Sequence, residues 1–271
     1  MSFTCDSPLK WPGGKHYLSG DIVEMMPEHT HFIDLYAGSF AVLFAKNPEG
    51  VSEVVNDING YLTNFWKVLQ EEQSFERFKR LCEATPFSQV EWREAESYRI
   101  EPDPVRRAWK FFIRCRQSMA GRMKSFAPLS KTRTRRKMNE QASAWLGAIE
   151  GLPEVHERLK GVVILNDDAI NVLRREDGIN TFAYLDPPYL HSTRVTTSEY
   201  GEFEMTPEQH QELLETLSVV KCKFLLSGYH SEMYDEFAKT HGWNCREFTI
   251  VNHASSQKSK PKMTECLWSN Y

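Results

Sequence analysis

The sequence of 271 residues predicts an α/β fold with a mostly parallel sheet and a helical insertion. Two observations indicate it. Short apolar runs alternate with helical patterns near both ends of the chain, which is typical of strand–helix–strand units. The middle of the chain shows helical periods and no convincing strand. The length fits one large α/β domain, or one domain that carries an insertion.

The first elements follow the order strand, helix, strand, helix. Residues 31–35 form the first expected strand, and 40–44 the helix after it. A second strand is expected at 52–56. The helix at 58–70 follows, with its apolar side chains on one face. Two consecutive strands separated by a helix are parallel neighbours, so this order predicts a parallel sheet.

The helical insertion is expected at 74–150, with a loop at 125–136 that is rich in Ser, Thr, Pro and Arg. The segment Thr206-Pro207-Glu208-Gln209 opens a helix well, because Thr can cap it, Pro suits its first position and Gln its third. After the insertion the sheet resumes, with strands expected near 162–165, 181–185, 222–227, 245–251 and 263–269.

Charge is distributed unevenly along the chain. The net charge is −4, but the 34 residues from Val105 to Met138 hold twelve Lys or Arg and no Asp or Glu, so the remainder carries −4 − 12 = −16. A charge run is commonly a solvated face. Because acidic residues are absent from so long a stretch, the segment favours a polyanion, and nucleic acid in particular, as its partner.

Several classes of protein are excluded. No apolar run approaches ~18 residues, so no membrane span is expected, and the N-terminus lacks the pattern of a secretory signal. The six cysteines are scattered without a C-x-x-C spacing, which indicates a reducing cytoplasm and neither a disulfide framework nor a zinc site. The nine histidines form no ligand pattern such as H-E-x-x-H, so no metal is expected.

The most informative motif is Asp186-Pro187-Pro188-Tyr189, directly after the expected strand 181–185. Its carboxylate is expected at the carboxyl end of a strand, where open α/β sheets bind ligands. The prolines stiffen the turn and have no N–H to donate, and an aromatic ring follows. A carboxylate, carbonyl acceptors and a ring suit the amino group of a planar heterocycle. The simpler alternative is a tight turn in which Tyr189 only packs.

A second candidate site is the turn Asp34-Leu35-Tyr36-Ala37-Gly38-Ser39. Gly38 would let a ligand approach the backbone at a helix N-terminus. Asp57 ends the next strand, 23 residues after Asp34, where an acidic side chain would take ribose hydroxyls. The alternative is that Asp57 caps the helix before Ile58. Neither G-x-G-x-x-G nor a P-loop is present, so binding of a nucleoside triphosphate is not expected.

A third candidate is the loop Lys10-Trp11-Pro12-Gly13-Gly14-Lys15. Its glycines expose the backbone, and a cation stands at each end. Such a loop could hold a small carboxylate through Lys15 and free N–H groups. The alternative is an N-terminal turn with solvated lysines.

These motifs, in this order, resemble the Dam-type DNA adenine-N6 methyltransferases. The resemblance covers nearly the whole chain except the helical insertion. Beside the three candidate motifs, it is carried by Asn56-Asp57-Ile58-Asn59, Asn166-Asp167-Asp168-Ala169, Glu204-Met205-Thr206, Leu226-Ser227-Gly228-Tyr229 and Glu265-Cys266-Leu267-Trp268-Ser269-Asn270.

The resemblance implies a Rossmann-like methyltransferase sheet with an antiparallel C-terminal strand. It implies a catalytic domain that binds S-adenosylmethionine at 1–72 and 151–271, and a helical, basic target-recognition domain at 73–150. The substrate would be double-stranded DNA. The protein would be cytoplasmic and encoded by a bacterium or phage. A restriction–modification role with a partner endonuclease and a solitary role both stay open.

The resemblance also implies roles for individual residues. Trp11 and Lys15 would line the methionine end of the donor. Asp57 would hold its ribose, and Asp168, or its neighbour Asp167, would lie near its adenine or methionine end. Phe40 replaces a small residue that is common in the family, so it would either reshape the donor pocket or cover the donor's adenine. Further contacts to the donor are expected from Asp34, Tyr36, Ala37, Gly38, Ser39 and Asp186.

The expected chemistry is methylation of an exocyclic amine. Its nitrogen is a poor nucleophile because the lone pair is delocalised into the ring. Asp186 and the Pro187 carbonyl would accept its two N–H bonds and free the lone pair for in-line attack on the sulfonium methyl. Pro188 and Tyr189 would complete the catalytic corner, and the base would be flipped out of the duplex. Phosphate contacts are expected from Arg114, Arg116, Arg122, Lys124, Arg133, Arg135 and Arg136.

Three alternatives stay open. The same corner suits the N4 amine of cytosine, and the resemblance alone favours adenine. RNA could replace DNA as the substrate. The chain could also be a catalytically inactive DNA-binding regulator, although the intact Asp186 argues against that. Methylation of cytosine at C5 is disfavoured, because it needs a Pro-Cys turn and none of the cysteines follows a proline.

Overall fold

The computed structural model describes residues 5–194, 201–251 and 262–271. The chain forms two compact units. The first comprises Met1–Glu24, Gly38–Glu49 and Asn59–Asn166, and the second comprises Met25–Ala37, Gly50–Ile58 and Asp167–Tyr271. The predicted recognition segment 73–150 lies within the first unit, together with parts of the predicted catalytic domain. The functional division into a catalytic and a recognition domain therefore stays a prediction.

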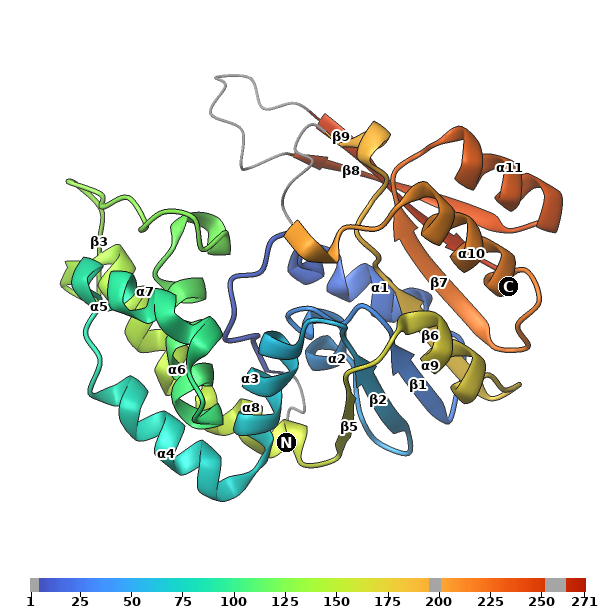
Figure 1. The fold of residues 1–271 in the computed structure, drawn as a ribbon. Coiled ribbons are helices and arrows are strands. Elements are labelled where there is room, and N and C mark those ends of the chain that lie inside the picture. The colour runs from blue at the N-terminus through green and yellow to red at the C-terminus, as the bar shows by residue number, and fades with distance from the viewer. Residues whose placement is uncertain (1–4, 195–200, 252–261) are drawn as a thin grey trace. The chain divides into compact units, whose positions relative to one another are not determined.

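The sheet has seven strands in the order β5-β2-β1-β6-β7-β9-β8. In the second unit, β1 pairs in parallel with β2 and β6, and β6 with β7. Strand β9 is antiparallel to both β7 and β8. The predicted α/β fold with an antiparallel C-terminal strand is confirmed (Figure 1). The strands are β1 (His31–Asp34), β2 (Ser52–Asn56), β5 (Val162–Leu165), β6 (Thr181–Leu185), β7 (Lys223–Gly228), β8 (Asn244–Val251) and β9 (Lys262–Ser269).

The central strands are largely buried. All five residues of β6 are buried, as are the last three of β1. Asp34 at the end of β1 pairs in register with Val55 of β2 and Tyr184 of β6. Because these three strands run parallel, the residues that follow them lie at one edge of the sheet.

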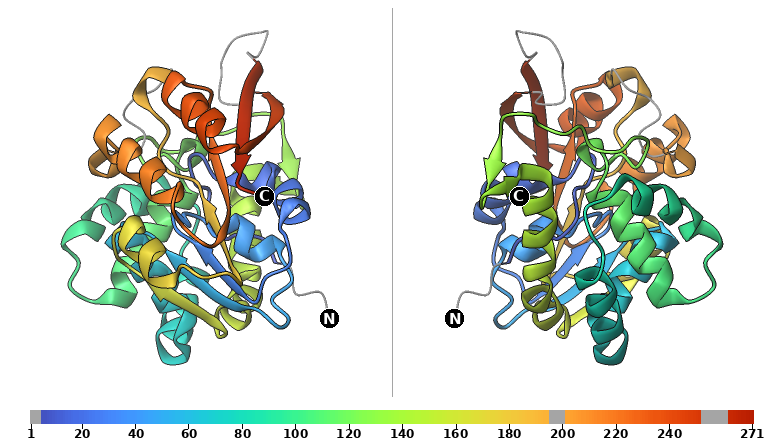
Figure 2. Two further views of the ribbon diagram at one scale, coloured as in Figure 1. Left: turned by 90° about the vertical axis from the view of Figure 1, so that its right-hand side faces the viewer. Right: turned by 90° about the vertical axis from the view of Figure 1, so that its left-hand side faces the viewer.

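Three helices cover one face of the sheet in the second unit (Figures 1 and 2): α9 (Ala169–Glu176), α10 (Pro207–Leu217) and α11 (Glu232–His241). The expected start of α10 is confirmed. The Thr206 side chain accepts a hydrogen bond from Gln209 N, and the Gln209 side chain accepts one from Thr206 N. Two short 3-10 helices, η4 (His191–Thr193) and η5 (Gly201–Phe203), precede α10.

The first unit is mostly helical. Its core forms where α3 packs on α6, with the Phe65 ring 5.6 Å from that of Phe112 and 5.9 Å from that of Phe111. The elements are η1 (Lys15–Tyr17), α1 (Ser19–Met25, whose last residue belongs to the second unit), α2 (Ala41–Ala45), α3 (Gly60–Gln70), α4 (Glu72–Glu83), α5 (Gln89–Glu94), η2 (Ala95–Ile100), α6 (Pro104–Arg116), η3 (Met119–Gly121), α7 (Glu140–Glu150) and α8 (Leu152–Leu159).

The expectation of no strand between 74 and 150 is wrong in one place. Two short strands, β3 (Thr134–Arg135) and β4 (Met138–Asn139), form a hairpin that begins within the expected loop 125–136. Its turn residues, Arg136 and Lys137, have φ of 56° and 62°. Two consecutive left-handed residues are what a two-residue hairpin turn requires. The usual sequence signal for that turn is Asn-Gly, so Arg-Lys gave no indication of it.

Within the described part of the chain, no helix combines the length and the apolar composition needed to cross a membrane.

Candidate active site

Three of the predicted acidic residues end neighbouring parallel strands of the second unit. Asp34 is the last residue of β1, Asp57 follows β2, and Asp186 follows β6. Asp34 is 2% exposed, whereas Asp57 and Asp186 are half-buried. Asp57 and Asp186 follow strands, as the sequence predicted, and the register of the strands brings the three carboxylates to one edge of the sheet.

The buried amide of Asn56 links the loops at this edge. Its Nδ2 donates to the carbonyl oxygens of Leu35 at 3.2 Å and Asp167 at 3.0 Å, and its Oδ1 accepts from Asp167 N at 3.0 Å. Its backbone carbonyl accepts from Ala37 N at 3.0 Å. Leaving such buried groups without partners would cost about 1–3 kcal/mol each. Asn56 thus fixes both the 34–37 turn and the 167–168 segment. In the sequence analysis Asn56 was only part of a motif, and no role was predicted for it.

Tyr36 marks the place where the acidic groups converge. Burial raises the pKa of its phenol well above the ordinary value, and Tyr234, Asp168 and Asp57 raise it further. The carboxylates of Asp57 and Asp168 therefore act on the Tyr36 phenol from different loops of the second unit. An edge with several fixed acceptors suits a ligand that carries hydroxyl and amino groups.

The alternative role for Asp57 as a helix cap is wrong. Helix α3 is capped by Asn59, whose Oδ1 accepts from Tyr61 N at 3.0 Å and Leu62 N at 3.3 Å. Asp168, by contrast, is a cap. Its Oδ1 accepts from Ile170 N at 2.9 Å and Asn171 N at 3.2 Å at the start of α9. Asp57 is therefore not a helix cap, and Asp168 combines any ligand contact with a structural role.

The aromatic ring of the 186–189 corner is held from two sides. The Tyr189 hydroxyl donates to the carboxylate of Glu265 on β9, which is 1% exposed. The Tyr229 ring meets the Tyr189 ring edge-on at 4.7 Å between centroids. Burial raises the pKa of Tyr189 well above its usual value, and Asp186 and Glu265 add to the effect. The phenol therefore stays neutral and acts as a donor. The alternative in which Tyr189 is only a packing residue does not account for this bond.

Sequence reasoning missed the role of Glu265. The residue was recognised only as part of the closing motif of the chain. A signal was present, however. An acid directly before Cys266, Leu267 and Trp268 in a buried strand needs a partner, because an isolated buried carboxylate is very costly. The structure supplies that partner in the Tyr189 hydroxyl.

His210 on α10 interacts with the backbone of the corner at Pro188. The residue is fully buried, and its Nδ1 is 2.8 Å from the Tyr234 hydroxyl oxygen. Burial lowers the pKa of the imidazole to about 4. The positive charges of Arg194 and His191 lower it further, while the Pro188 backbone opposes the shift. A neutral imidazole therefore supports the corner at ordinary pH.

Ion pairs hold the segment that follows the corner. The Arg194 guanidinium bonds the Glu204 carboxylate through both NH1 and NH2, and His191 Nε2 lies 3.2 Å from the same group. Both Arg194 and Glu204 have largely buried side chains. The chain leaving the corner is thereby tied to the segment that enters α10.

In the first unit, the 10–15 loop has a glycine-dependent shape. Gly13 has φ of 73°. A Cβ added to Gly14 would lie 3.1 Å from Ser39 Oγ and 3.2 Å from the Trp11 carbonyl oxygen, which is tighter than almost all such contacts. Lys15 is 4% exposed, and its Nζ donates to the Gly13 carbonyl at 3.1 Å. The alternative of a solvated Lys15 is therefore wrong.

The helical segment clamps the start of this loop. The Lys10 carbonyl accepts a hydrogen bond from Cys115 Sγ at 2.9 Å, and a Cβ on Gly121 would lie only 1.9 Å from that oxygen. The Trp11 ring packs on Phe111 at 6.2 Å. Within the first unit, the predicted donor loop and the basic helix α6 therefore form one packed structure.

The turn at Gly38 is also confined by packing. Gly38 has φ of 51°, and its carbonyl accepts from Trp66 Nε1 at 3.0 Å. Phe40 is 1% exposed and stacks on the Trp66 ring at 4.2 Å. Of the two alternatives for Phe40, a ring that covers the donor's adenine is disfavoured, because the ring is a core residue of the first unit, and an effect on the shape of the donor pocket stays a prediction. Ala37 and Ser39 are buried beside the turn.

Two of the predicted DNA-binding arginines have structural roles instead. Arg114 is 6% exposed, lies 3.6 Å from the centroid of the Trp92 ring, and donates to the Trp92 and Met123 carbonyls at 3.1 and 2.6 Å. Arg116 is half-buried and donates to the Ala144 carbonyl at 2.9 Å. A side chain must be exposed to contact a DNA phosphate, so the predicted phosphate contact by Arg114 is wrong. Arg116 connects α6 to α7 through its hydrogen bond to Ala144.

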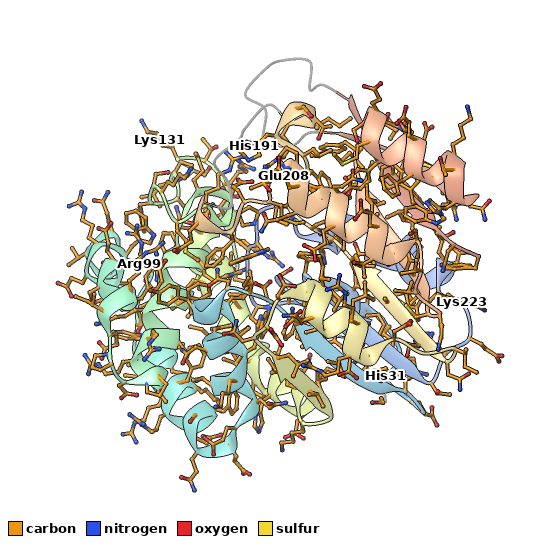
Figure 3. All side chains as sticks on the ribbon, turned by 45° about the vertical axis from the view of Figure 1, so that its right-hand side comes forward. His31, Arg99, Lys131, His191, Glu208 and Lys223 are labelled. Atoms are coloured by element: carbon orange, nitrogen blue, oxygen red, sulfur yellow. The ribbon has the colours of Figure 1, made fainter. Side chains whose placement is uncertain are left out.

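Most of the other cations predicted to contact DNA are exposed, unlike Arg114 and Arg116, and so suit that contact better. Figure 3 shows the Lys131 side chain pointing away from the helices of the first unit. Two exposed arginines, one just before β3 and one in the hairpin turn, also form ion pairs with acidic residues. Arg133 Nε lies 3.5 Å from Glu140, and Arg136 makes a two-point contact with Glu150 at 2.7 and 3.0 Å. Arg122 is half-buried, and the exposed members are Lys124, Arg133, Arg135 and Arg136.

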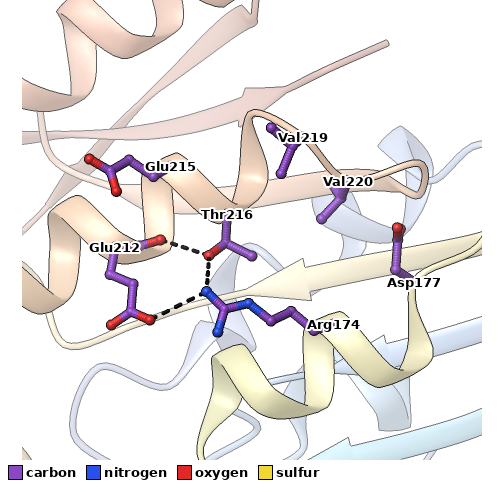
Figure 4. A pocket seen from close by; sticks show the side chains of 7 residues that line it. All are labelled: Arg174, Asp177, Glu212, Glu215, Thr216, Val219 and Val220. Carbon is purple, nitrogen blue, oxygen red and sulfur yellow. Dashed lines mark hydrogen bonds and ion pairs between the residues drawn. The ribbon is translucent and has the colours of Figure 1, made fainter.

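A pocket of about 280 Å³ between α9 and α10 contains none of the predicted site residues (Figure 4). Arg174 crosses it to Glu212 at 3.4 Å and Thr216 at 3.3 Å. Asp177 accepts hydrogen bonds from the backbone N–H groups of Lys221 and Cys222. The polar side chains that line the pocket therefore connect α9 to α10 and to the residues just before β7.

The motifs, their order and the strand-end acids all agree with one family. Residues 11–253 match the family model of the D12 class N6 adenine-specific DNA methyltransferases. The chain belongs to this family. The match includes the predicted donor loop from Trp11 onward, the Gly38 turn, the helical insertion and the 186–189 corner. The resemblance to Dam-type enzymes is thus confirmed, and the chain is a methyltransferase of the DNA adenine type by family.

The other comparisons add little. Among curated proteins, none matches this chain. One similar solved structure is that of a proposed RNA methyltransferase from Pyrococcus horikoshii, with 10% identity and a TM-score of 0.37, covering 94% of this chain and 79% of that one. A likeness of this level carries no argument about substrate.

The state of His210 predicts a pH dependence of stability. Its folded pKa of about 4 lies below the ordinary value of 6.5, so the unfolded chain binds more protons between these two pH values. The free energy of unfolding should therefore fall by up to about 3 kcal/mol as the pH drops from 6.5 to 4, and this group should contribute no slope above that window.

Urea unfolding across this pH range measures the effect. His210→Asn keeps a polar atom for the Tyr234 hydroxyl and should flatten the slope. The exposed His16 provides the matched control, because His16→Asn should leave the slope as in the native chain. A His210→Asn slope equal to the native one would contradict the role given to the buried imidazole.

Proposed function

We propose that the chain transfers a methyl group from S-adenosylmethionine to the N6 amine of adenine in double-stranded DNA, as a site-specific DNA-methyltransferase (adenine-specific). One observation carries the proposal. Asp186 stands at the carboxyl edge of a parallel sheet, next to an aromatic ring that a buried carboxylate holds in place. Membership of the N6 adenine-specific family supports the choice of base.

The strand-end acids of the second unit fit a nucleoside with an amino acid tail. Asp57 is half-buried and does not cap a helix, so its carboxylate suits the two ribose hydroxyls of the donor. Asn56 fixes the two segments that hold Tyr36, Ala37 and Asp168, and Asp34 directly precedes the first of them. We assign these residues to the donor's adenosine part, with Asp167 as an outer residue because its Oδ1 accepts from Asp168 N.

The family resemblance also assigns residues of the first unit to the donor. Gly38 and Ser39 give a turn whose backbone can be approached closely. Trp11 and Lys15 would lie along the methionine portion, where Lys15 supplies a positive charge for its carboxylate. The bound donor would supply an electrophilic methyl group on a sulfonium sulfur.

Asp186 and Pro187 would prepare the nucleophile. The Asp186 carboxylate and the Pro187 carbonyl accept the two N–H bonds of the adenine amine, which draws the nitrogen toward tetrahedral geometry. Positioning then provides most of the rate increase, because the lone pair points along the line of transfer. After transfer the nitrogen carries a positive charge, and its surplus proton passes to Asp186 or to solvent.

Tyr189 would hold the flipped base. Extrusion costs a few kcal/mol, and stacking on an aromatic ring offsets about 1–3 kcal/mol of it. Glu265 and Tyr229 fix the ring beforehand, so less conformational freedom is lost on binding. Pro188 keeps the chain between the carboxylate and the ring stiff.

DNA would be bound through the exposed cations of the 122–137 segment. The β3–β4 hairpin presents Arg135 beside the turn residues Arg136 and Lys137, all of them exposed. Arg133 and Lys124 extend this charge along the segment. Phosphate contacts by such residues supply affinity without regard to sequence. Some of them could also read guanine, which arginine contacts through two hydrogen bonds.

Nucleoside mass spectrometry of duplex DNA treated with the protein and S-adenosylmethionine tests the proposal. N6-methyladenine is the expected product. N4-methylcytosine alone would favour the alternative cytosine-N4 activity, which the same corner could perform. Preference for an RNA competitor would reassign the substrate, and DNA binding without any methylated product would make the chain a regulator.

Replacing Asp186 isolates the catalytic step. Asp186→Ala should lower the methylation rate at least about 100-fold, because the amine loses its acceptor. Affinity for S-adenosylmethionine should stay largely intact. Radiolabelled methyl transfer under single-turnover conditions measures the first quantity, and calorimetry the second. The exposed Asp6 gives the control variant, Asp6→Ala. A rate within a few-fold of the native one would refute the role of Asp186.

The hairpin cations should govern the salt dependence of DNA binding. The triple variant Arg133→Ala, Arg135→Ala, Lys137→Ala should weaken binding to every sequence. It should also reduce the slope of log affinity against log salt by ~0.9 for each lost phosphate contact. Fluorescence anisotropy over a salt series measures the slope. Lys223→Ala with Lys239→Ala, on the second unit, serves as the control. An unchanged slope in the triple variant would show that the hairpin is a solvated surface.

A further inference from the structure

A histidine and two cysteines converge on the second unit, and none of them takes part in the proposed methyl transfer. One ligand atom from each of His230, Cys245 and Cys266 lies within 4.8 Å of the others. Cys245 belongs to β8 and Cys266 to β9, while His230 follows β7. These residues are 15 and 21 positions apart in the sequence, so their spacing gave no metal signal. Only the strand pairing brings them together.

Two carboxylates complete the surroundings of the imidazole. Asp235 Oδ1 lies 2.8 Å from His230 Nδ1, and Glu247 Oε1 lies 3.3 Å from His230 Nε2. A histidine that binds a metal commonly donates its other ring N–H to a carboxylate, which fixes the ring and its tautomer. Asp235 occupies Nδ1 in this way, so Nε2 is the nitrogen that would face a cation, with Glu247 beside it.

The charges around the cluster suit a positive ion. Two carboxylates, those of Asp235 and Glu247, flank the His230 imidazole. Cysteine binds a metal ion as the thiolate, so binding would release protons from sulfur.

We propose that His230, Cys245, Cys266 and Glu247 bind a thiophilic divalent cation of the Zn²⁺ class, with Asp235 orienting the histidine. Two thiolates, an imidazole and a carboxylate are ligands that Zn²⁺ takes in tetrahedral sites. Such a site needs roughly 3.3–3.8 Å between ligand atoms, given metal–ligand bonds of about 2.0–2.3 Å. The distance from Nε2 to Glu247 already fits. The ligand atoms of His230, Cys245 and Cys266 lie within 4.8 Å of one another, so these three need to close by at most about 1 Å. Glu247 lies outside that group, so its carboxylate would turn toward the sulfurs on binding.

The strand register favours a cation over a disulfide. Cys245 pairs with Trp268 and Cys266 with Glu247, so the two cysteines are diagonal neighbours. Diagonal positions in an antiparallel pair are about 7–8 Å apart at Cα. A disulfide needs a Cα separation below about 7 Å, so bonding here would require the backbone to move. A metal bridges the longer span through its own bonds.

The site is exposed to solvent, and one of its strands, β9, also carries Glu265, which holds the Tyr189 ring. His230, Cys245 and Glu247 are exposed, whereas Cys266 is buried. Alternation along β9 places Cys266 on the opposite face from Glu265, which bonds Tyr189. A bound cation would tie β8, β9 and the end of β7 together, and so stiffen the strand that carries Glu265.

A cobalt titration of the reduced, full-length protein tests the proposal. Co²⁺ should bind in a ratio of one to one, with a thiolate-to-cobalt charge-transfer absorption that added Zn²⁺ abolishes. Cys245→Ser should remove most of that absorption and weaken Co²⁺ binding more than 100-fold. Asp235→Asn should keep the absorption and weaken binding about 10- to 100-fold. Because Cys245 is exposed, its replacement leaves the core intact.

Cys5→Ser is the matched control, because Cys5 lies in the first unit, and it should behave like the native protein. Circular dichroism confirms that each variant is folded. Co²⁺ binding without the thiolate absorption would overturn the proposal, since carboxylates alone would then hold the ion. The same absorption in Cys245→Ser would overturn it too. None of these readouts depends on methyl transfer, so the result is independent of the proposed function.

Discussion

The side-chain amide of Asn56 is the constraint on which the edge of the sheet depends. It joins the Leu35 carbonyl, just after β1, to the backbone of Asp167, and the backbone carbonyl of Asn56 accepts a hydrogen bond from Ala37 N. The parallel register of β1, β2 and β6 brings acidic residues to one edge, but it does not fix the loops that follow the strands. Asn56 does so in the buried interior, where lost hydrogen bonds are expensive. The proposed donor contacts at Tyr36, Asp57 and Asp168 follow from that arrangement.

The 186–189 corner is stiff for several independent reasons. The prolines restrict its backbone, Glu265 and Tyr229 hold its aromatic ring, and the buried His210 interacts with the Pro188 backbone. Preorganisation of this kind suits a reaction that depends on aiming a weak nucleophile. The supporting groups come from β9, from the residue after β7 and from α10. This explains why the sequence motif alone does not show how the corner works.

Much of this could be predicted from the sequence, for physical reasons. Apolar runs followed by Asp gave the strands and the edge acids, and Thr206 with Gln209 gave the start of α10. The pairing of Tyr189 with Glu265 and the bonds of Asn56 could not be derived, because they join residues far apart in the chain. Charge counting also failed for Arg114, since burial against Trp92 decides its role and composition does not reveal burial. The β3–β4 hairpin was missed because its turn uses Arg136 and Lys137 in place of the usual Asn-Gly.

The affinity of the Asp57→Asn variant for S-adenosylmethionine tests the central claim most directly, because it probes the strand-end acids without involving DNA. Isothermal calorimetry should show binding weakened at least about 10-fold relative to the native chain, since a charged hydrogen-bond acceptor contributes about 1.5–3 kcal/mol. Asp21→Asn, on α1, should bind as the native chain does. Equal affinities for the native chain and Asp57→Asn would contradict the account of this edge as the donor site.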